Sequence, residues 1–408
     1  MYGKLLVGID IGSSEIKLVA AERRDTEELK FLGEKSIEAK GIEKGIIKNH
    51  YDASNAITNL IVESQKLIGR QITDIYITVP SGICQLIHTK GEVEVNDGEG
   101  IIGKRDIQRA REAACRIVTP HDYKFIQLIE NKYNIDEKMS TKNPIRMKGR
   151  SLVLEGRAVL ISAKCYKDYL NIFKELDIEV NGLRIACEAA AELLIDDLDK
   201  NRGAILVDCG KNKIDIATFY EGILQEVMQV AVGGEIITKD ISYCFKINGV
   251  QAEELKSFSN TGSSDLHTTS PIDYNLLREV IDARLLEMGE MIEKELKNRK
   301  NNTDISNIII YGQGISLFNN ISNRFSSISD RNISFVGSEL YDHIDSKYMN
   351  ARGLVNLVYN ELKWDYEKEN VSANVIEENV IKNKTEKSKF IKKHGIVSKM
   401  KSILEDLF

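Results

Sequence analysis

One local plan occurs twice in this chain, and it constrains the fold more than any other feature of the sequence. Residues 7–19 run from an apolar stretch through Asp10 into a Gly-Ser-Ser turn and then into a second alternating stretch. Residues 205–217 follow the same order, with Asp208 preceding Gly210 and a short turn. Apolar, β-forming runs on both sides of a tight turn are typical of a β-hairpin. We therefore expect two similar hairpins, one in each half of the chain.

The turn of the first hairpin has the chemistry of a phosphate-binding site. Successive backbone N–H groups at such a turn form a concave nest that suits phosphate oxygens. Gly12 lets the backbone approach closely, the hydroxyls of Ser13 and Ser14 add donors, and Asp10 is suited to hold a hydrated Mg²⁺. No Gly-Lys-Ser/Thr follows, so the turn is not a P-loop. A single turn of this kind is better explained as an ordinary β-turn, and only its repetition favours phosphate binding.

A glycine turn farther along the chain completes the pattern. Residues 308–311 form an apolar, buried-type strand that runs into Gly312, Gln313 and Gly314. Two phosphate hairpins followed by a glycine turn suited to a purine resemble the actin, sugar-kinase and heat-shock chaperone ATPase superfamily. The resemblance implies an α/β fold with two lobes, an actin-like ATPase fold made of duplicated ribonuclease-H-like domains.

Length, composition and charge agree with a soluble two-lobed protein. The 408 residues exceed what one core usually holds, and 42% hydrophobic with 29% charged residues is ordinary for a soluble chain. The net charge of −6 argues against nucleic acid as a partner. Six scattered cysteines without a CxxC pair suggest reduced thiols in the cytosol. Neither a signal peptide nor a membrane-spanning run is expected, and the histidines show no metal-ligand spacing.

Changes in composition and hydrophobic pattern along the chain predict its division into segments. Clustered glycines, a mixed helix and a polar stretch mark an insertion in the first lobe, and a long helix with one apolar stripe marks the second. The expected segments are a first lobe (1–80 and 151–200), an inserted α+β subdomain (81–150), a second-lobe core (201–235 and 305–364), a second-lobe helical subdomain (236–304), a flexible tether (365–388) and a terminal amphipathic helix (389–408).

The terminal segment has the pattern of a membrane-surface helix. Apolar residues recur at helical spacing on one face, and polar residues occupy the other. Residues 389–408 carry five lysines and two acids, a net +3 on a chain of −6, which favours a helix lying on anionic lipid. The alternative is a helix that folds onto the body or pairs with a partner helix. The residues expected at the membrane are Ile396, Val397, Met400, Ile403, Leu404, Leu407 and Phe408, with Lys399 and Lys401 beside them.

Taken together, these features resemble FtsA, the bacterial cell-division actin homologue, over nearly the full length of the chain. Residues 8–14 match the family's first phosphate motif, and residues 143–149 resemble the stretch that closes its inserted subdomain. Residues 232–241 are close to the start of the family's nucleotide-contacting helix. A tether with a terminal amphipathic helix distinguishes FtsA within the superfamily.

The resemblance implies a site for ATP and Mg²⁺ between the lobes. Asp10 and Asp208 would flank the metal through water, and Glu235 and Lys239 would lie near the ribose and base. The alternative interpretation is that Glu235 is an acid in the first turn of a helix and that Lys239 is a solvated lysine. No catalytic general base is identified, and the family consists of polymerising adaptors with at most weak ATPase activity. The residues expected at the nucleotide are Asp10, Gly12, Ser13, Ser14, Asp208, Gly210, Asn212, Gly233, Gly234, Glu235, Lys239, Gly312, Gln313 and Gly314.

The second phosphate turn departs from the family pattern. Lys211, Asn212 and Lys213 stand where glycine and threonine are usual, and Gln313 replaces a middle glycine of the purine turn. Side chains at a nest obstruct the close approach that glycine allows. Two ammonium groups would, conversely, supply positive charge beside a triphosphate. The sequence leaves both a weak or degenerate ATP site and a lysine-assisted one open.

Partners and location follow from the resemblance as further expectations. They are the C-terminal tail of FtsZ, bound at about 236–304, other copies of the chain in filaments, other division proteins, and anionic lipids at the cytoplasmic face of the cell membrane at the division site. One alternative is a PilM-like pilus-assembly ATPase, which would not need the amphipathic tail. The other is a sugar or carboxylate kinase, which would need a catalytic aspartate in the cleft and would leave the tail unexplained.

Overall fold

Two compact units divide the chain, Met1–Leu357 and Val358–Phe408. The tether and terminal helix expected at 365–388 and 389–408 lie outside the described residues. The computed structural model describes residues 3–23, 29–96, 98–261, 272–298, 307–315, 331–336 and 346–363, and the single residues 305, 325 and 329.

The first lobe is built on a mixed five-stranded sheet with the order β11-β6-β1-β2-β3. Its central strand, β1 (Lys4–Ile11), pairs antiparallel with β2 (Glu15–Arg23) and parallel with β6 (Asp74–Val79). The outer strands are β3 (Leu29–Glu38) and β11 (Glu179–Ile185). The first predicted hairpin is therefore confirmed as β1–β2. Because β1 is covered on both faces, its apolar run is continuous rather than alternating.

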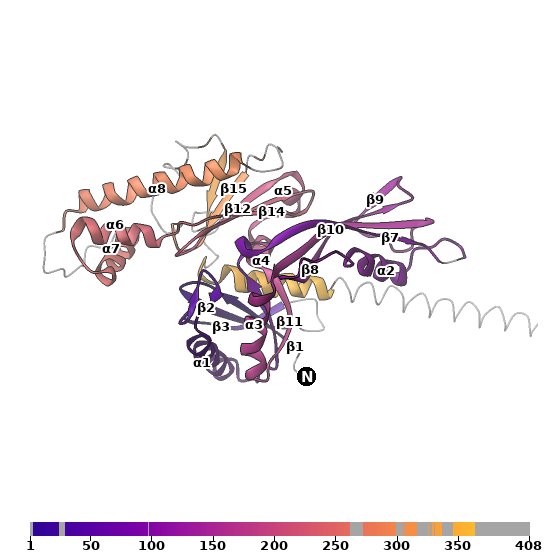
Figure 1. The fold of residues 1–408 in the computed structure, drawn as a ribbon, viewed down its shortest axis with the longest axis horizontal. Coiled ribbons are helices and arrows are strands. Elements are labelled where there is room, and N and C mark those ends of the chain that lie inside the picture. The colour runs from indigo at the N-terminus through magenta and orange to yellow at the C-terminus, as the bar shows by residue number, and fades with distance from the viewer. Residues whose placement is uncertain are drawn as a thin grey trace, which may run out of the picture. The chain divides into compact units, whose positions relative to one another are not determined.

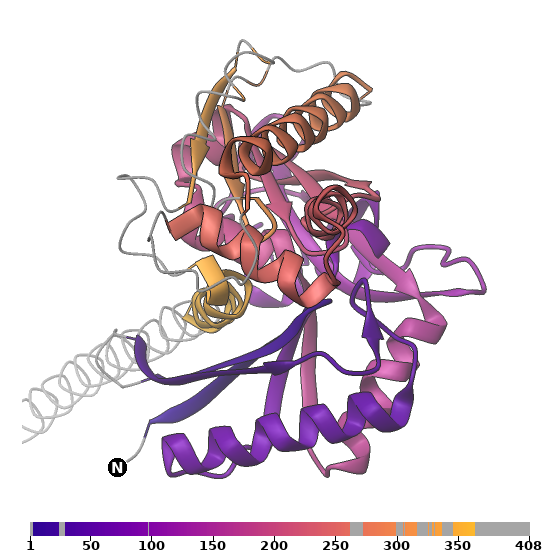
Figure 2. The same cartoon turned by 90° about the vertical axis from the view of Figure 1, so that its left-hand side faces the viewer.

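Helices and short strands complete this lobe. Helix α1 (His50–Ile68) starts at Asn49, whose side chain accepts the Asp52 N–H, and ends at Gly69 in a left-handed conformation. It runs along the face of β2 and β3 (Figure 2). The other elements here are β4 (Ile42–Glu43), β5 (Ile46–Ile47) and α3 (Ala163–Glu175).

The second lobe repeats the topology of the first. Its strands are β12 (Ala204–Cys209), β13 (Ile214–Tyr220), β14 (Ile223–Val230), β15 (Asn307–Tyr311) and β16 (Asn332–Phe335). Their order is β14-β13-β12-β15-β16, with β12 antiparallel to β13 and parallel to β15. In each lobe the first strand of the hairpin is the central strand of the sheet. Its hairpin partner lies on one side of it, and parallel strands lie on the other side. The second predicted hairpin is thus confirmed as β12–β13, and the duplication includes the whole sheet.

Three helices share one hydrophobic cluster with the second sheet, and α8 lies along the sheet (Figure 1). They are α6 (Glu235–Phe245), α7 (Gly249–Thr261) and α8 (Tyr274–Lys297). Asp273 caps α8 by accepting the N–H groups of Asn275 and Leu276. The predicted apolar stripe of α8 is confirmed, since all its members are buried: Leu277, Ile281, Leu285, Met288, Ile292 and Leu296.

The inserted subdomain is longer than the sequence suggested. Its sheet has the order β7-β10-β8-β9, and α2 (Lys104–Ala114) packs on β7 and β10. The expected boundary at residue 150 places β10 in the first lobe, whereas the structure pairs β10 along its length with β7 and β8. A strand that ends an insertion has the same alternating sequence pattern as a strand of the lobe, because both kinds of strand are half-buried. The elements are η1 (Ser81–Ile83), β7 (Gln85–Glu94), β8 (Tyr123–Ile135), β9 (Met139–Thr141) and β10 (Ser151–Ser162).

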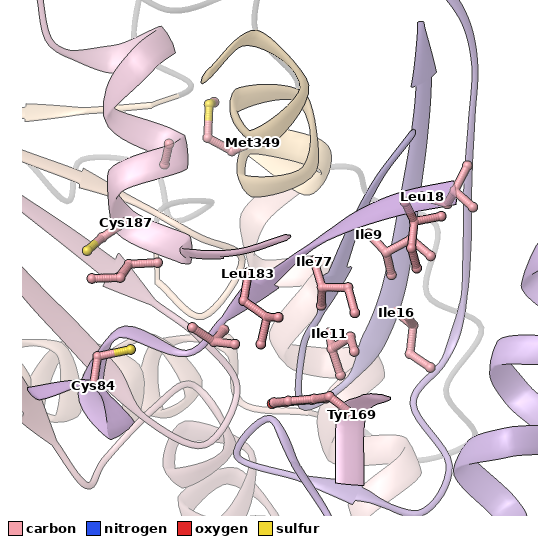
Figure 3. Packing of buried hydrophobic residues seen from close by; sticks show 14 of the residues in the cluster. Ile9, Ile11, Ile16, Leu18, Ile77, Cys84, Tyr169, Leu183, Cys187 and Met349 are labelled. Atoms are coloured by element: carbon pink, nitrogen blue, oxygen red, sulfur yellow. The ribbon is translucent and has the colours of Figure 1, made fainter. Parts of the chain in front are cut away.

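Two helices pack across the junction of the lobes. Helix α4 (Ala186–Leu194) follows β11 of the first sheet and contacts β12 and β13 of the second; α5 (Asp197–Arg202) comes after it. The helix at 349–363, preceded by η3 (Ser346–Tyr348), follows the second sheet and packs its first turns against β1. One hydrophobic cluster includes residues of both lobes, among them Ile9, Ile77 and Met349 (Figure 3). The two hairpin turns are thereby held at a shared core.

Candidate functional site

The turns of the two hairpins line one cavity of about 260 Å³. Residues from both lobes contribute, since β1 and β12 end at this point and the glycine turn after β15 closes one side. Its volume is slightly below the usual range for small-molecule pockets, roughly 300–1,000 Å³. Among the residues expected at the nucleotide, those that line it are Asp10, Gly12, Ser13, Ser14, Asp208, Gly210, Gly234, Gly312, Gln313 and Gly314.

Asp10 lies at the end of β1, where two neighbouring strands fix its carboxylate. It faces Lys17 across the hairpin and Thr78 across the parallel pair with β6. The Thr78 hydroxyl donates to Asp10 Oδ1 at 2.6 Å, and Lys17 Nζ lies 3.7 Å from Oδ2. Only 5% of Asp10 is exposed. The carboxylate is therefore held in one orientation by its sheet neighbours.

Asp208 takes the same place in the second lobe, but its surroundings are more acidic. It faces Asp215 across β13 and Tyr311 across β15. Asn350 links these groups, because its Nδ2 donates to Asp208 Oδ2 at 3.4 Å and its Oδ1 accepts from the Tyr311 hydroxyl at 2.9 Å. Removal from water, with repulsion from the carboxylates of Asp215 and Asp10, raises the pKa of Asp208 to about 6.

Glycine is required at the turns because backbones meet there. The Gly12 N–H donates to the Glu15 carbonyl at 3.1 Å, and a Cβ on Gly12 would lie 2.7 Å from that carbonyl oxygen. Gly312 has a φ of +95°, and a Cβ there would lie 2.6 Å from Asp208 Oδ1. The expected glycine turn after β15 thus lies directly against the second hairpin.

Four residues expected at the nucleotide do not line the cavity: Asn212, Gly233, Glu235 and Lys239. The first turn of α6 is bonded to the second hairpin, with the Glu235 N–H donating to the Lys211 carbonyl at 2.8 Å. The Glu235 carboxylate lies 3.5 Å from Lys211 Nζ, and Lys239 is exposed. The interpretation of this pair as a first-turn acid and a solvated lysine therefore fits the structure better than a nucleotide contact.

Another acid–lysine pair, on α7, lines the cavity. Lys256 is 7% exposed, and its Nζ donates to Glu253 Oε2 at 2.7 Å and to Thr238 Oγ1 at 2.8 Å. Sequence reasoning missed this pair because an acid three residues before a lysine is common on solvated helices. The other lining residues that it did not expect at the nucleotide include Lys17, Asp215, Lys347 and Asn350, whereas Lys213 belongs to the lysine-assisted alternative.

The charges of the cavity fit a nucleoside triphosphate with a divalent cation. Among the described lining residues are five lysines and four carboxylates. Burial raises the pKa of Asp208 most, and the added repulsion from Asp215 and Asp10 would be relieved by a cation held through water between Asp10 and Asp208. Lysine side chains and turn N–H groups would meet phosphate oxygens. The residues present therefore suit ATP and Mg²⁺, and a bound Mg²⁺ would supply charge neutralisation for the phosphates.

Comparison with known proteins identifies related sequences. A family model described as "SHS2 domain inserted in FTSA" matches residues 82–160, and one described as "Cell division protein FtsA" matches residues 205–353. Cell division protein FtsA of Borreliella burgdorferi is 26% identical over 407 residues, covering 94% of this chain and 98% of that protein. The Bacillus subtilis protein of the same name is 23% identical over 366 residues, covering 86% and 83%. The first match includes most of β10, in agreement with the longer insertion.

Solved structures show the same fold at low sequence identity. The PilM-PilN type IV pilus biogenesis complex has a TM-score of 0.59 at 14% identity, covering 86% of this chain and 97% of that one. MreB5 of Spiroplasma citri bound to AMPPNP has a TM-score of 0.54 at 14% identity, covering 90% and 99%. The expected actin-like two-lobed ATPase fold is therefore confirmed.

Proposed function

Because this chain belongs to the FtsA family of cell-division proteins, we propose that it is an ATP-binding adaptor that attaches the FtsZ ring to the cytoplasmic membrane. The nucleotide-binding part of the proposal rests on the cavity lined by both hairpin turns, with Asp10 and Asp208 on opposite lobes. In this proposal the two aspartates hold Mg²⁺ through water. The hydroxyls and backbone N–H groups of Ser13 and Ser14 bind phosphates, and Glu253 with Lys256 lies toward the ribose and base.

Asp10→Asn is expected to lower the affinity for Mg²⁺-ATP by about tenfold or more, because a charged partner of the hydrated metal is lost. The amide oxygen of asparagine still accepts the Thr78 hydroxyl, so the fold should be retained. Titration calorimetry with and without Mg²⁺ measures this, and circular dichroism checks the fold. Asp122→Asn, which changes an aspartate with a 92% exposed side chain, is the matched control and should bind like the wild type. Equal Mg²⁺-ATP affinity of the Asp10→Asn variant and the wild type would contradict the proposed metal role.

The adaptor part of the proposal rests on two surfaces. For FtsZ, we propose the helices α6 to α8, where Tyr243 and Val250 are 86% and 70% exposed on either side of the short α6–α7 connection. Exposed apolar side chains of this size suit a partner peptide. For the membrane, we propose the amphipathic pattern at 389–408, which carries a net charge of +3. No helix among the described residues is long and apolar enough to span a bilayer.

Self-association completes the proposed adaptor. Lobes that stack head to tail use different surfaces on each copy, and such heterologous contacts generate open filaments rather than closed rings. Filaments would array many terminal helices and many FtsZ-binding surfaces along one membrane, which strengthens attachment through multivalency. The PilM-like and kinase alternatives share the fold only, whereas the family matches and the two curated relatives cited above carry the FtsA name.

A further inference from the structure

Lys213 is an enclosed cation in the wall of the nucleotide cavity. It is 9% exposed, and its Nζ donates to Asp215 Oδ2 at 2.5 Å. Gln229 Nε2 donates to the other oxygen, Asp215 Oδ1, at 2.9 Å. Asp215 itself is 4% exposed. The aspartate is therefore engaged on both oxygens and fixes the position of the ammonium group.

Lys211 in the same turn has a different environment. Its side chain is 47% exposed and its Nζ lies 3.5 Å from Glu235. The turn is closed by the bond from the Gly210 N–H to the Lys213 carbonyl, after which Lys213 leads into β13. Of the two lysines that replace the expected glycine and threonine residues, one lies at the solvated rim and the other is enclosed.

The duplicated hairpins each provide one lysine held by an aspartate. In the first, Lys17 lies opposite Asp10, with Nζ 3.7 Å from Oδ2. In the second, the residue opposite Asp208 is Asp215, and the lysine comes two positions earlier, on the same side of an extended strand. Each lobe thus contributes one of these lysines to the lining of the same cavity.

We propose that Lys213 is a phosphate-binding residue that determines the preference of this site for polyphosphate ligands. The inference rests on the proposed nucleotide-binding function. An ammonium group has three donors, and among the described residues its hydrogen bond goes to Asp215, so donors remain for phosphate oxygens. A buried ion pair is weak evidence for a purely stabilising role, because apolar replacement is often neutral or better. Charge-assisted bonds to phosphate replace those that a glycine nest would have made.

Lys213→Met is expected to weaken ATP binding by about 10- to 100-fold, the usual value of a hydrogen bond to a charged group. ADP should be affected less, and AMP by less than about twofold, because fewer phosphate charges meet the lysine. Calorimetric titration with each nucleotide, in Mg²⁺ and again in EDTA, measures the series. The difference should persist in EDTA, since it comes from the ammonium group. Lys294→Met removes an exposed lysine of α8 outside the cavity and should change none of these affinities.

The Lys213→Met variant could fail to fold, because Asp215 would lose its charged partner. A second comparison, with a neutral pair, then tests the inference. Lys213→Gln with Asp215→Asn retains a hydrogen-bonded pair without charge, and it is compared with Asp215→Asn alone, which keeps the ammonium group. The double variant should lose ATP affinity relative to the single one. Equal or tighter ATP binding without the lysine, an equal loss for AMP, or a loss that disappears in EDTA would each overturn the inference. A wild type that does not bind ATP at millimolar concentration would overturn the nucleotide proposal together with it.

Discussion

Deletion of residues 389–408 is expected to abolish flotation of the protein with anionic liposomes and to leave a folded, soluble body. A helix over 396–408 would be about 20 Å long, which is too short to be stable alone in water. It should therefore become ordered only when its apolar face meets lipid. Apolar burial supplies most of the affinity, and three net cations add about 3 kcal/mol on an anionic leaflet.

Two substitutions of equal charge separate the apolar face from the polar face of this segment. Leu404→Glu removes about 2 kcal/mol of apolar burial and adds repulsion of about 1 kcal/mol, which is roughly a 100-fold loss of partitioning. Ser402→Glu adds the same charge to the polar face and should cost only about fivefold. Flotation and circular dichroism measure both variants. Flotation of the deletion variant would show that the segment is not the membrane anchor, and an unfolded body in Leu404→Glu would show that it packs against the protein.

Gly353→Ala is expected to destabilise the body, because two helices at the junction of the lobes meet there through their backbones. A Cβ on Gly353 would lie 2.0 Å from the Ala189 carbonyl oxygen and 3.0 Å from the Ala190 nitrogen, both of α4. No side chain can move aside, so one helix must shift. Overpacking of this kind costs about 1–3 kcal/mol, which outweighs the higher helix propensity of alanine, and the unfolding temperature should fall by about 5 °C.

Gly249→Ala is the matched control for this substitution. Gly249 is the first residue of α7, and a Cβ there would meet nothing within 4 Å. Alanine should therefore leave the unfolding temperature unchanged or raise it slightly. Differential scanning calorimetry compares the two variants under one condition. If both variants melt alike, the close contact between α4 and the helix at 349–363 does not limit stability.

The hairpins and the strand pattern of both lobes could be predicted because they depend on local sequence. Alternating and continuous apolar runs, closed by glycine turns, determine β1–β2 and β12–β13 within a few residues. Asp10 and Asp208 could be placed at one site for the same reason, since each lies near the end of a central strand. The stripe on α8 was equally visible, because its period is that of one buried helix face.

The remaining parts of the site depend on tertiary packing that no local pattern shows. Asn350 reaches Asp208 only because the helix that follows the second sheet packs across the junction. Lys256 reaches the cavity because α7 packs beside α6, and this packing decides which of two acid–lysine pairs lies there. The end of the insertion was missed because buried and exposed residues alternate in β10 as in any half-buried strand. Only the pairing of β10 with β7 and β8 assigns it to the inserted subdomain.

Co-flotation of purified FtsZ is the most direct measurement of the proposed adaptor function. FtsZ, anionic liposomes and ATP are mixed with the full-length protein, with the variant lacking 389–408, or with neither. We expect FtsZ in the floating fraction only with the full-length protein, and a reduced amount when Tyr243 and Val250 are both changed to serine. FtsZ that stays in the dense fraction while the full-length protein floats would contradict the adaptor function.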